Sequence, residues 1–457
     1  MIAMRKIADT QLSAAGSANR QVLVLGMGAT GASCARHFAG RGTAAWFADT
    51  RAAPPGLDAI RQAMPGAGLM AGDIPAVVPP GVSRIVVSPG VDLDLPVLAD
   101  ARRRGLPVLS DLDLFAAECR APMIGITGSN GKSTVTSMTG AMLASDGWRV
   151  AVGANLGTPA LDLLDPSVRA YVLELSSFQL ERSAPLPLAA AVVLNVAPDH
   201  LDKHGSLTAY TAAKARIYAR CGTAIVNRDD PALARLVPLA IPVISFGLSA
   251  PENGHFGVIS DARGECLAFG GDALMPVSEL GTTGRHNVAN ALAALAVIHA
   301  AGAGIPGALG GLRAFRGLPH RMQVVTVTDG VTWIDDSKAT NVAAAVTSIR
   351  SVRGPLVLIA GGDGKGQAFG ELAVALRGRD AVAILIGRDR GQIARDIAGA
   401  SAVEMADTLQ EAVARARRLA RPGHTVLLAP ACSSLDMFRN YEHRGQVFAA
   451  SVRGGAR

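Results

Sequence analysis

A phosphate-binding loop is the most specific chemical signal in the chain, at Ile126–Thr134 with the sequence ITGSNGKST. It lies between an apolar strand and a helix, where backbone N–H groups of the turn point at phosphate oxygens. Lys132 can then bridge the β- and γ-phosphates, and Ser133 can bind Mg²⁺ through its hydroxyl. The match to G-x-x-x-x-G-K-S is incomplete, because Ile126 occupies the position of the first glycine. The loop predicts nucleotide binding. The alternative interpretation is an ordinary strand-to-helix turn with a lysine on the surface.

Oxygen and nitrogen ligands follow two other apolar strands. Glu174 ends one strand, and Asp199 and His200 come after Ala190–Asn195. Open α/β sheets bind ligands at the carboxyl ends of strands, and Mg²⁺ in triphosphate chemistry needs hard oxygen ligands. A lone carboxylate there is more often structural, but two such ends beside a phosphate loop favour a metal-dependent reaction. Lys214, on an expected helix, indicates by itself only a solvated helix face.

A second glycine-rich turn lies near the start of the chain. The apolar segment Gln21–Leu25 predicts a buried strand that runs into the GMGATG motif of Gly26–Gly31, and the next strand ends at Asp49. This spacing lets the backbone approach a phosphate or sugar, and an acidic residue in this place takes a ribose hydroxyl. An NAD-dependent oxidoreductase would explain this unit but would leave Ile126–Thr134 without a role.

The elements that must position these residues are alternating strands and helices. We expect a boundary near residue 110, a second parallel sheet from Met123 to Phe246, and an antiparallel edge in His255–Pro276. Gly and Pro then cluster around residue 317, which predicts a hinge into a third α/β unit with strands between Thr332 and Leu428.

Composition excludes several classes of protein. The 457 residues are 49% hydrophobic with 51 glycines, too apolar for disorder and too turn-rich for a coiled coil. The net charge of +7 favours an anionic ligand over nucleic acid, because the longest basic run is Arg102–Arg104. Five dispersed cysteines without a C-x-x-C pair argue against disulfides or zinc. Met1–Arg20 is polar and no membrane span is apparent, so we expect a soluble, cytoplasmic protein.

Later polar segments are each compatible with a turn or a helix cap, and only their occurrence together is informative. They are His286–Asn290, Leu318–Arg321, Asp335–Asn341, Gly361–Lys365 and Ser433–Asp436. Together with Ile126–Thr134 and the LELSSFQLE run of Leu173–Glu181, they make the chain resemble the Mur ligase family of peptidoglycan synthesis. The matching motifs extend from Gly26 to Tyr441, and the resemblance is closest to the members that add glutamate.

The resemblance implies an α/β fold in three domains. Residues 17–110 would form a Rossmann-like domain that binds a UDP-sugar, and residues 111–316 a P-loop ATPase-like parallel-sheet domain that binds ATP. Residues 317–457 would form a Rossmann-like domain that binds glutamate. The implied reaction passes the ATP γ-phosphoryl group to the carboxylate of UDP-N-acetylmuramoyl-L-alanine, and the amine of D-glutamate attacks the acyl phosphate. We expect a monomer that binds these small molecules and neither nucleic acid nor a membrane.

The resemblance also assigns residues by motif position. Lys132 would contact the phosphates, Ser133 and Glu174 would hold one Mg²⁺, and His200 with Lys214 would hold a second. Lys214 would carry a carbamate derived from CO₂, because an ammonium group would repel Mg²⁺ whereas a carbamate is an oxygen ligand.

Further matches fall into three groups by ligand. For ATP they are Gly128, Ser129, Asn130, Gly131, Thr134, Asn287, Asn290, Arg321 and Asp336. For the UDP-sugar they are Gly28, Asp49, Thr50 and Arg51, and Asn155 and His200 match substrate contacts. For glutamate they are Thr340, Lys365, Ser434, Leu435 and Tyr441, where a cation beside hydroxyls suits two carboxylates. Tyr441 departs from the phenylalanine usual in the family, and its hydroxyl either binds glutamate or faces water.

Three alternatives stay open. A different Mur-type ligase or a folylpolyglutamate-type synthetase would share the phosphate loop, but Asp49–Arg51 and the pair Lys365 and Ser434 favour the glutamate-adding members. An L-glutamate-adding variant is the second, and the run Lys338–Asn341 favours D-glutamate. A non-catalytic nucleotide-binding module is the third, and it would not need Glu174, His200 and Lys214 together.

Overall fold

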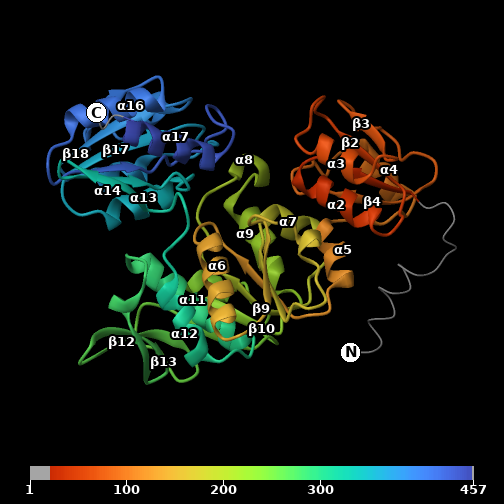
Figure 1. The fold of residues 1–457 in the computed structure, drawn as a ribbon, viewed down its shortest axis with the longest axis horizontal. Coiled ribbons are helices and arrows are strands. Elements are labelled where there is room, and N and C mark those ends of the chain that lie inside the picture. Colours follow the sequence, from red (N-terminus) through yellow and green to blue (C-terminus); the bar gives the residue numbers. More distant parts are fainter. Residues whose placement is uncertain (1–20, 455–457) are drawn as a thin grey trace. The chain divides into compact units, whose positions relative to one another are not determined.

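Residues 21–454 are described by the computed structural model, and they form three β-sheets (Figure 1). The expected polar leader, Met1–Arg20, lies outside the described residues. Two compact units make up the structure, and each is considered by itself. Unit 1 contains the described residues of Met1–Leu194, with Ala212–Pro276 and Ala291–Leu312. Unit 2 contains Asn195–Thr211, Val277–Asn290 and the described residues from Arg313 onward. The predicted α/β class with mostly parallel sheets is confirmed.

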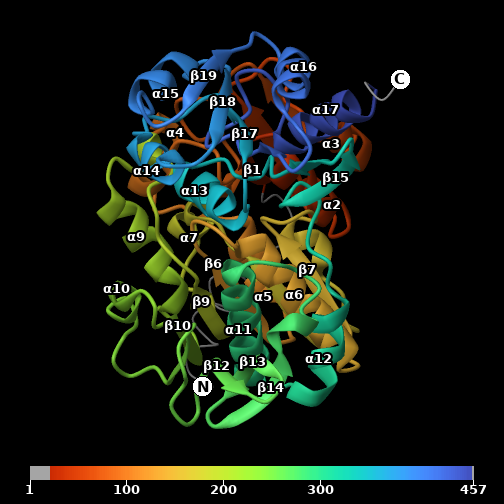
Figure 2. The same cartoon turned by 90° about the vertical axis from the view of Figure 1, so that its left-hand side faces the viewer.

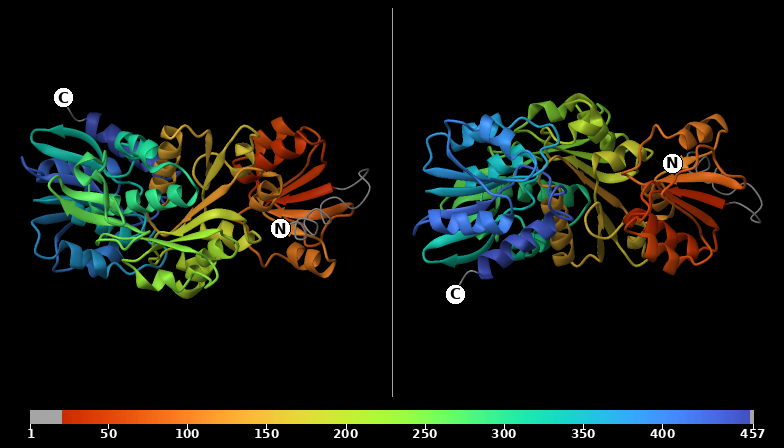
Figure 3. Two further views of the ribbon diagram at one scale, coloured as in Figure 1. Left: turned by 90° about the horizontal axis from the view of Figure 1, so that it is seen from below. Right: turned by 90° about the horizontal axis from the view of Figure 1, so that it is seen from above.

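The first sheet of unit 1 is parallel, with strand order β3-β2-β1-β4-β5. Its elements are β1 (Gln21–Leu25), α2 (Ala29–Ala39), β2 (Ala45–Asp49), α3 (Leu57–Ala63), β3 (Gly68–Ala71), β4 (Val82–Val87), α4 (Pro96–Arg103) and β5 (Val108–Leu109). Figure 3 shows this red-to-orange sheet from two sides. Strand order reverses beside β1, and ligands of open sheets bind outside the carboxyl ends of the strands at such a point.

The second sheet of unit 1 has nine strands in the order β14-β13-β12-β11-β10-β9-β6-β8-β7. Its strands are β6 (Met123–Thr127), β7 (Val150–Ala154), β8 (Ala170–Glu174), β9 (Leu188–Val193), β10 (Thr223–Asn227), β11 (Val243–Phe246), β12 (Phe256–Asp261), β13 (Gly264–Phe269) and β14 (Asp272–Pro276). The last three are antiparallel, as predicted for this edge. In β6 and β8 Ile126 lies opposite Glu174, so both strands end at the same edge of the sheet.

Helices connect or flank these strands. They are α5 (Asp111–Glu118), α6 (Lys132–Ser145), α7 (Ser177–Arg182), α8 (Leu201–His204), α9 (Leu207–Ala215), α10 (Pro231–Ala234), α11 (Arg285–Ala300) and α12 (Ile305–Ala314). The interior of α11 is almost wholly buried from Ala291 to Ile298, because alanine and branched apolar residues surround its axis on every side. No helix among residues 21–454 is both long enough and apolar enough to span a bilayer.

The sheet of unit 2 has the order β15-β16-β20-β17-β18-β19. Its elements are β15 (Gln323–Thr328), β16 (Val331–Asp335), α13 (Val342–Ser351), β17 (Leu356–Gly361), α14 (Gly370–Leu376), β18 (Ala381–Ile386), α15 (Arg390–Asp396), β19 (Ala402–Met405), α16 (Leu409–Leu419), β20 (Thr425–Leu428) and α17 (Tyr441–Gly454). One apolar cluster joins the sheet to α13, α14 and α15, and a second joins the opposite face to α16 and α17 (Figure 2). Strand β15 is antiparallel to β16 and carries a bulge between Val324 and Thr326.

Candidate active site

The phosphate loop connects β6 to α6. Thr127 ends the strand, and Lys132 is the first residue of the helix, as the motif predicts. Gly131 precedes the helix with φ of +82°, a left-handed conformation that glycine adopts without a steric penalty. The first-turn side chains of Ser133 and Thr134 are buried. The N-terminus of a 14-residue helix therefore faces the loop, which favours an anionic ligand.

Two lysines converge on the loop within unit 1. Lys132 Nζ donates to Gly128 O at 2.8 Å and to Ser129 O at 3.0 Å. Lys214 Nζ donates to the same Gly128 oxygen at 2.9 Å, and Lys214 is only 1% exposed. The interpretation of Lys214 as part of a solvated helix face is therefore wrong. Its amine lies against the loop, near the C-terminal end of α9.

Glu174 is held by an amide from the neighbouring strand. The Glu174 side chain is buried at the end of β8, and Asn155 follows the end of β7. Asn155 Nδ2 donates to Glu174 Oε1 at 2.5 Å, while Asn155 N donates to Glu174 O at 3.0 Å. Asn155 therefore orients the carboxylate that ends beside the phosphate loop.

Asp49 organises the candidate UDP-sugar site at the end of β2. Its carboxylate accepts from Met27 N at 2.8 Å, from Arg51 N at 2.9 Å and from two guanidinium nitrogens of Arg51 at 2.8 and 2.7 Å. The Arg51 guanidinium lowers the pKa of Asp49 to about 2, although burial opposes this shift. Gly28 lies in the turn that precedes α2, and Thr50 is exposed beside Asp49. Asp49 thus ties the glycine-rich turn to the segment that follows β2.

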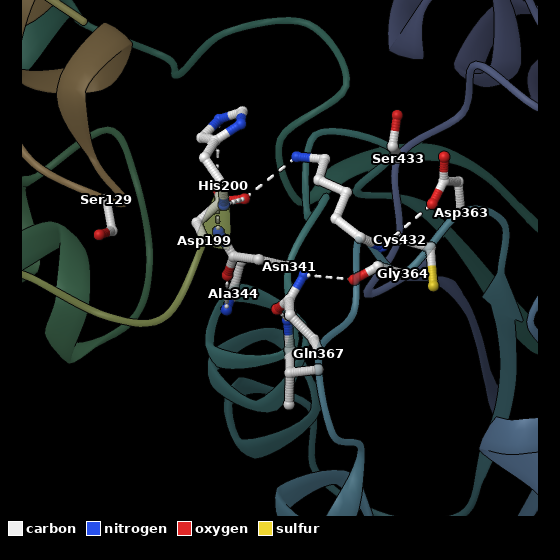
Figure 4. A network of polar contacts seen from close by, with 12 residues as sticks. Ser129, Asp199, His200, Asn341, Ala344, Asp363, Gly364, Gln367, Cys432 and Ser433 are labelled. Carbon is white, nitrogen blue, oxygen red and sulfur yellow. Dashed lines mark hydrogen bonds and ion pairs between the residues drawn. The ribbon is translucent and has the colours of Figure 1, made fainter. Parts of the chain in front are cut away.

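A polar network in unit 2 surrounds Asp199, which is 6% exposed (Figure 4). Its carboxylate accepts from Lys365 Nζ at 3.1 Å and from Asn341 Nδ2 at 3.2 Å. Burial alone would raise the pKa of Asp199, but the charges of His200 and Lys365 outweigh burial and lower it. His200 follows with φ of +54° and leads into α8.

The candidate glutamate residues gather where β16, β17 and β20 end. The backbones of Asp363 and Ser433 exchange two hydrogen bonds of 3.1 and 2.8 Å, which join the loops after β17 and β20. These loops carry Lys365, Ser434 and Leu435, of which Ser434 is buried and Leu435 is exposed.

Thr340 lies in the loop that follows β16 and precedes α13, within the same unit. Tyr441 is the first residue of α17, and Lys338 Nζ lies 3.7 Å from the centre of its ring. This aromatic contact with a cation gives the ring a second partner besides any ligand.

The candidate nucleotide residues of unit 2 lie on three segments. Asn287 and Asn290 share the first turns of α11, where Asn290 Nδ2 donates to Asn287 Oδ1 at 3.2 Å. Arg321 precedes β15, and Asp336 follows β16. Asp336 is 7% exposed and accepts from Met322 N at 3.1 Å and from the hydroxyl of Ser348. Burial raises the pKa of Asp336 to about 6 against the effect of these two hydrogen bonds.

Arg444 is a residue that sequence reasoning did not single out. Its side chain is 1% exposed in α17 and donates to Ser337 Oγ at 2.9 Å, Ser337 O at 2.8 Å and Cys432 O at 3.1 Å. Burial lowers the pKa of Arg444 to about 10. The arginine ties the loops after β16 and β20 together, and no motif around it signals this role.

Within their own units, the predicted residues form two sets. Unit 1 holds the phosphate loop with Asn155, Glu174 and Lys214, and also the turn around Asp49. Unit 2 holds His200 with the remaining nucleotide and glutamate candidates. Asp199, which sequence reasoning noted beside His200 without assigning it a ligand, links His200 to Lys365 and Asn341. No group of three or more His, Cys, Asp or Glu side chains among residues 21–454 is arranged to hold a metal by itself.

Three family models match successive parts of the chain. They are described as Mur ligase MurD-like, N-terminal domain (residues 20–110), Mur ligase middle domain (126–298) and Mur ligase, glutamate ligase domain (320–432). Proteins named UDP-N-acetylmuramoylalanine--D-glutamate ligase are similar over nearly their whole length. The one from Methylobacillus flagellatus is 46% identical over 95% of this chain and 97% of its own. The one from Pseudomonas aeruginosa is 45% identical over 94% of this chain and 97% of its own.

Solved structures show the same fold at lower identity. UDP-N-acetylmuramate-alanine ligase MurC from Thermotoga maritima matches 95% of this chain and 99% of its own, with a TM-score of 0.60 and 18% identity. A pseudomurein peptide ligase type C from Methanothermus fervidus matches 90% of this chain and 96% of its own, with a TM-score of 0.58 and 20% identity. The family models and the near full-length relatives together lead to one assignment: the chain belongs to the Mur ligase family.

Proposed function

We propose that this protein joins D-glutamate to UDP-N-acetylmuramoyl-L-alanine in an ATP-dependent step of peptidoglycan precursor synthesis. The observation that carries the proposal is 46% identity to a ligase of that name across 97% of the relative's length. The γ-phosphoryl group of ATP moves to the carboxylate of the nucleotide substrate. The amine of D-glutamate then displaces phosphate, which leaves an amide, ADP and inorganic phosphate.

We assign one principal ligand to each part of the chain. Residues 17–110 bind the UDP-sugar, 111–316 bind ATP, and 317–457 bind glutamate. The glycine-rich turn and Asp49 support the first assignment, because the carboxylate fixes both the turn and Arg51. We also propose that the protein works in the cytoplasm, because the reaction consumes ATP, and that it acts as a monomer.

The phosphate loop positions ATP in this proposal. Backbone N–H groups at the start of α6 and the ammonium group of Lys132 hold the phosphates, where they stabilise charge that moves during transfer. Asn287 and Asn290 contact the nucleoside, and Arg321 contacts the γ-phosphate.

The donor set fits Mg²⁺, because the Ser133 hydroxyl and the Glu174 carboxylate are hard oxygen ligands. Asn155 keeps Glu174 oriented at the edge where Ser133 begins α6. Bound Mg²⁺ would neutralise phosphate charge. We assign a second ion to His200 and to Lys214 in carbamylated form, since a carbamate supplies the oxygen donors that an amine lacks.

The glutamate site uses the loops that meet at the ends of β16, β17 and β20. Lys365 offers a cation, and Ser434 and Thr340 offer hydroxyl groups to the two carboxylates. Lys365 is already oriented by Asp199, so an incoming carboxylate meets an ammonium group that is held in place. Leu435 and Tyr441 line the same site.

Product release from the purified protein tests the function. ADP and phosphate should appear only when ATP, Mg²⁺, UDP-N-acetylmuramoyl-L-alanine and D-glutamate are all present. L-Glutamate in the same assay is the matched control, and it should support little turnover. Phosphate release that persists undiminished without the sugar nucleotide would contradict the proposal, and equal rates with both enantiomers would contradict its stereochemical part.

Chemical rescue tests the assignment of Lys214. The Lys214→Ala variant should lose activity and regain part of it when short carboxylates such as acetate or formate are added, because these can take the place of the carbamate. Lys203→Ala, which removes an exposed lysine of α8, is the control. Full activity of Lys214→Ala, or the absence of any rescue, would count against the carbamate.

A further inference from the structure

We propose that His320 and Asp335 are positioning residues that fix the direction in which Arg321 leaves the backbone, and thereby make the site favour ATP over ADP. The inference rests on the proposed function, in which Arg321 contacts the γ-phosphate. Neither His320 nor Asp335 is a ligand in that proposal.

Arg321 lies between two residues in an uncommon backbone conformation. His320 has φ of +60° and Met322 has φ of +47°, both in the left-handed region. Residues other than glycine rarely adopt this backbone conformation. Where they do, contacts from their surroundings hold them in it. Two of them on either side of one arginine mean that the turn is fixed by contacts from outside it.

The first set of contacts holds His320. His320 Nδ1 lies 2.7 Å from Asp335 Oδ2, and Asp335 is buried at the end of β16. His320 N donates to Gln323 Oε1 at 3.0 Å, and His320 O accepts from Lys338 N at 3.1 Å. The ring, the N–H and the carbonyl of this one residue are all bound.

The second set of contacts holds the other side of Arg321. Met322 N donates to Asp336 Oδ1 at 3.1 Å, and the Ser348 hydroxyl of α13 donates to the second Asp336 oxygen. Consecutive acidic residues therefore bind the residues before and after Arg321. Because β16 is hydrogen-bonded on both sides, to β15 and to β20, this pair of acids is a rigid support.

Gly445 of α17 closes the site around the histidine. A Cβ atom at this position would lie 2.2 Å from His320 Nδ1 and 2.7 Å from Asp335 Oδ2. Only a residue without a side chain lets the helix approach the pair so closely. The packing keeps the ring of His320 in one orientation, so the direction of Arg321 is set before ATP binds.

Nucleotide affinities measured by calorimetry in the presence of Mg²⁺ test the proposal. The ligands are a non-hydrolysable ATP analogue, AMP-PNP, and ADP. His320→Gly keeps the backbone freedom but removes the bond to Asp335, so it should lose about tenfold in affinity for AMP-PNP and less than about twofold for ADP. His320→Asn should retain most of the affinity, since asparagine tolerates positive φ and its amide can donate to Asp335.

A matched control separates the turn from general strain. Asp329, in the β15–β16 hairpin of the same unit, also has positive φ, of +53°. Asp329→Gly relieves that conformation away from Arg321 and should leave both affinities unchanged. Asp335→Asn is a second probe of the pair that keeps its shape, and it should lower AMP-PNP affinity by less than His320→Gly does.

A double-mutant cycle decides whether the effect passes through Arg321. In an Arg321→Ala background, His320→Gly should cause no further loss of AMP-PNP affinity. An equal further loss would overturn the proposal, as would equal losses for AMP-PNP and ADP. The binding assay does not depend on turnover. If the wild-type protein bound AMP-PNP selectively but released no phosphate with all substrates, the proposed function would fail while the positioning role stood.

Discussion

Asp49 in unit 1 and Asp336 in unit 2 lie at the same kind of position with opposite electrostatic outcomes. Asp49 ends β2 and Asp336 directly follows β16, and they are 4% and 7% exposed. The pKa of Asp49 is lowered to about 2 because Arg51 supplies a charged partner, whereas burial raises the pKa of Asp336 to about 6. Among the hydrogen-bond donors to Asp336 are a backbone N–H and a hydroxyl, which are neutral. The hydrogen bonds from a charged partner dominate at Asp49 and burial dominates at Asp336, so the pKa values of these two acids shift in opposite directions.

A third buried acid, Asp199 in the segment between β9 and α8, gives the largest expected effect. Asp199 is also buried, yet Lys365 and His200 keep its pKa low. Lys365→Met removes both the partner of Asp199 and the proposed glutamate cation, so kcat/KM for glutamate should fall about a hundredfold. The control is Arg388→Met, which removes a cation from the more exposed pair with Asp363 in the same unit. Steady-state kinetics with varied glutamate measure both, and equal losses would break the comparison.

Asp49→Asn should have the next largest effect, a loss of unfolding free energy. Loss of the charge weakens four hydrogen bonds at a buried site, and we expect about 2 kcal/mol of lost unfolding free energy. Asp261 is the control, because Arg263 also lowers its pKa to about 2, but on the surface. Asp261→Asn should cost clearly less, since surface ion pairs are screened by water. Urea denaturation at pH 7 compares the two variants.

The contributions of Asp49 and Asp336 to stability should change in opposite directions as the pH rises. The pKa of Asp49 is lower in the folded protein, so its stabilisation is present above about pH 4 and is lost as pH falls toward 2. The pKa of Asp336 is raised, so its contribution is favourable below about pH 4 and is lost as pH rises through about 6.

Comparison of Asp336→Asn with the wild type isolates the second effect. The variant should gain at least about 1 kcal/mol relative to the wild type between pH 4 and pH 7. Denaturation at several pH values measures this difference. A constant difference across that range would show that Asp336 does not titrate there.

Ser348→Ala should have the smallest effect. The Ser348 hydroxyl donates to Asp336 and lowers its pKa. Its removal should raise the pKa of Asp336 further, by about half a unit. The carboxyl signal of Asp336 in an NMR titration measures the shift. A fall in the pKa would mean that the hydroxyl does not stabilise the carboxylate.

Most of the fold follows from local sequence patterns. The segments Met123–Thr127 and Thr425–Leu428 are strands with the predicted bounds, because both are apolar runs at the centre of a sheet. Sequence reasoning missed four strands, and every one is the edge of its sheet. They are β3, β7, β15 and β19. An edge strand is buried on fewer sides, so its apolar signal is weaker.

The candidate site was predictable where chemistry is local. The phosphate loop gives its own signal through glycine, lysine and hydroxyl spacing, and α6 begins at Lys132 as predicted. The hydrogen bond from buried Lys214 to Gly128 joins residues that are 86 positions apart in the sequence. The bond from Met322 N to Asp336 likewise depends on how two chain segments meet. Contacts of this kind are fixed by tertiary packing and leave no spacing pattern.

The bulge in β15 has a consequence for self-association. This strand is an open edge of the unit 2 sheet, and Val324 and Val327 on it are 55% and 63% exposed. A regular edge strand with exposed apolar side chains is a template for pairing with a strand from another molecule. The register shift between Val324 and Thr326 interrupts the regular hydrogen-bond ladder and twists the strand. We therefore expect this irregularity to weaken the pairing of β15 with a strand from another molecule, although β15 carries no charged side chain.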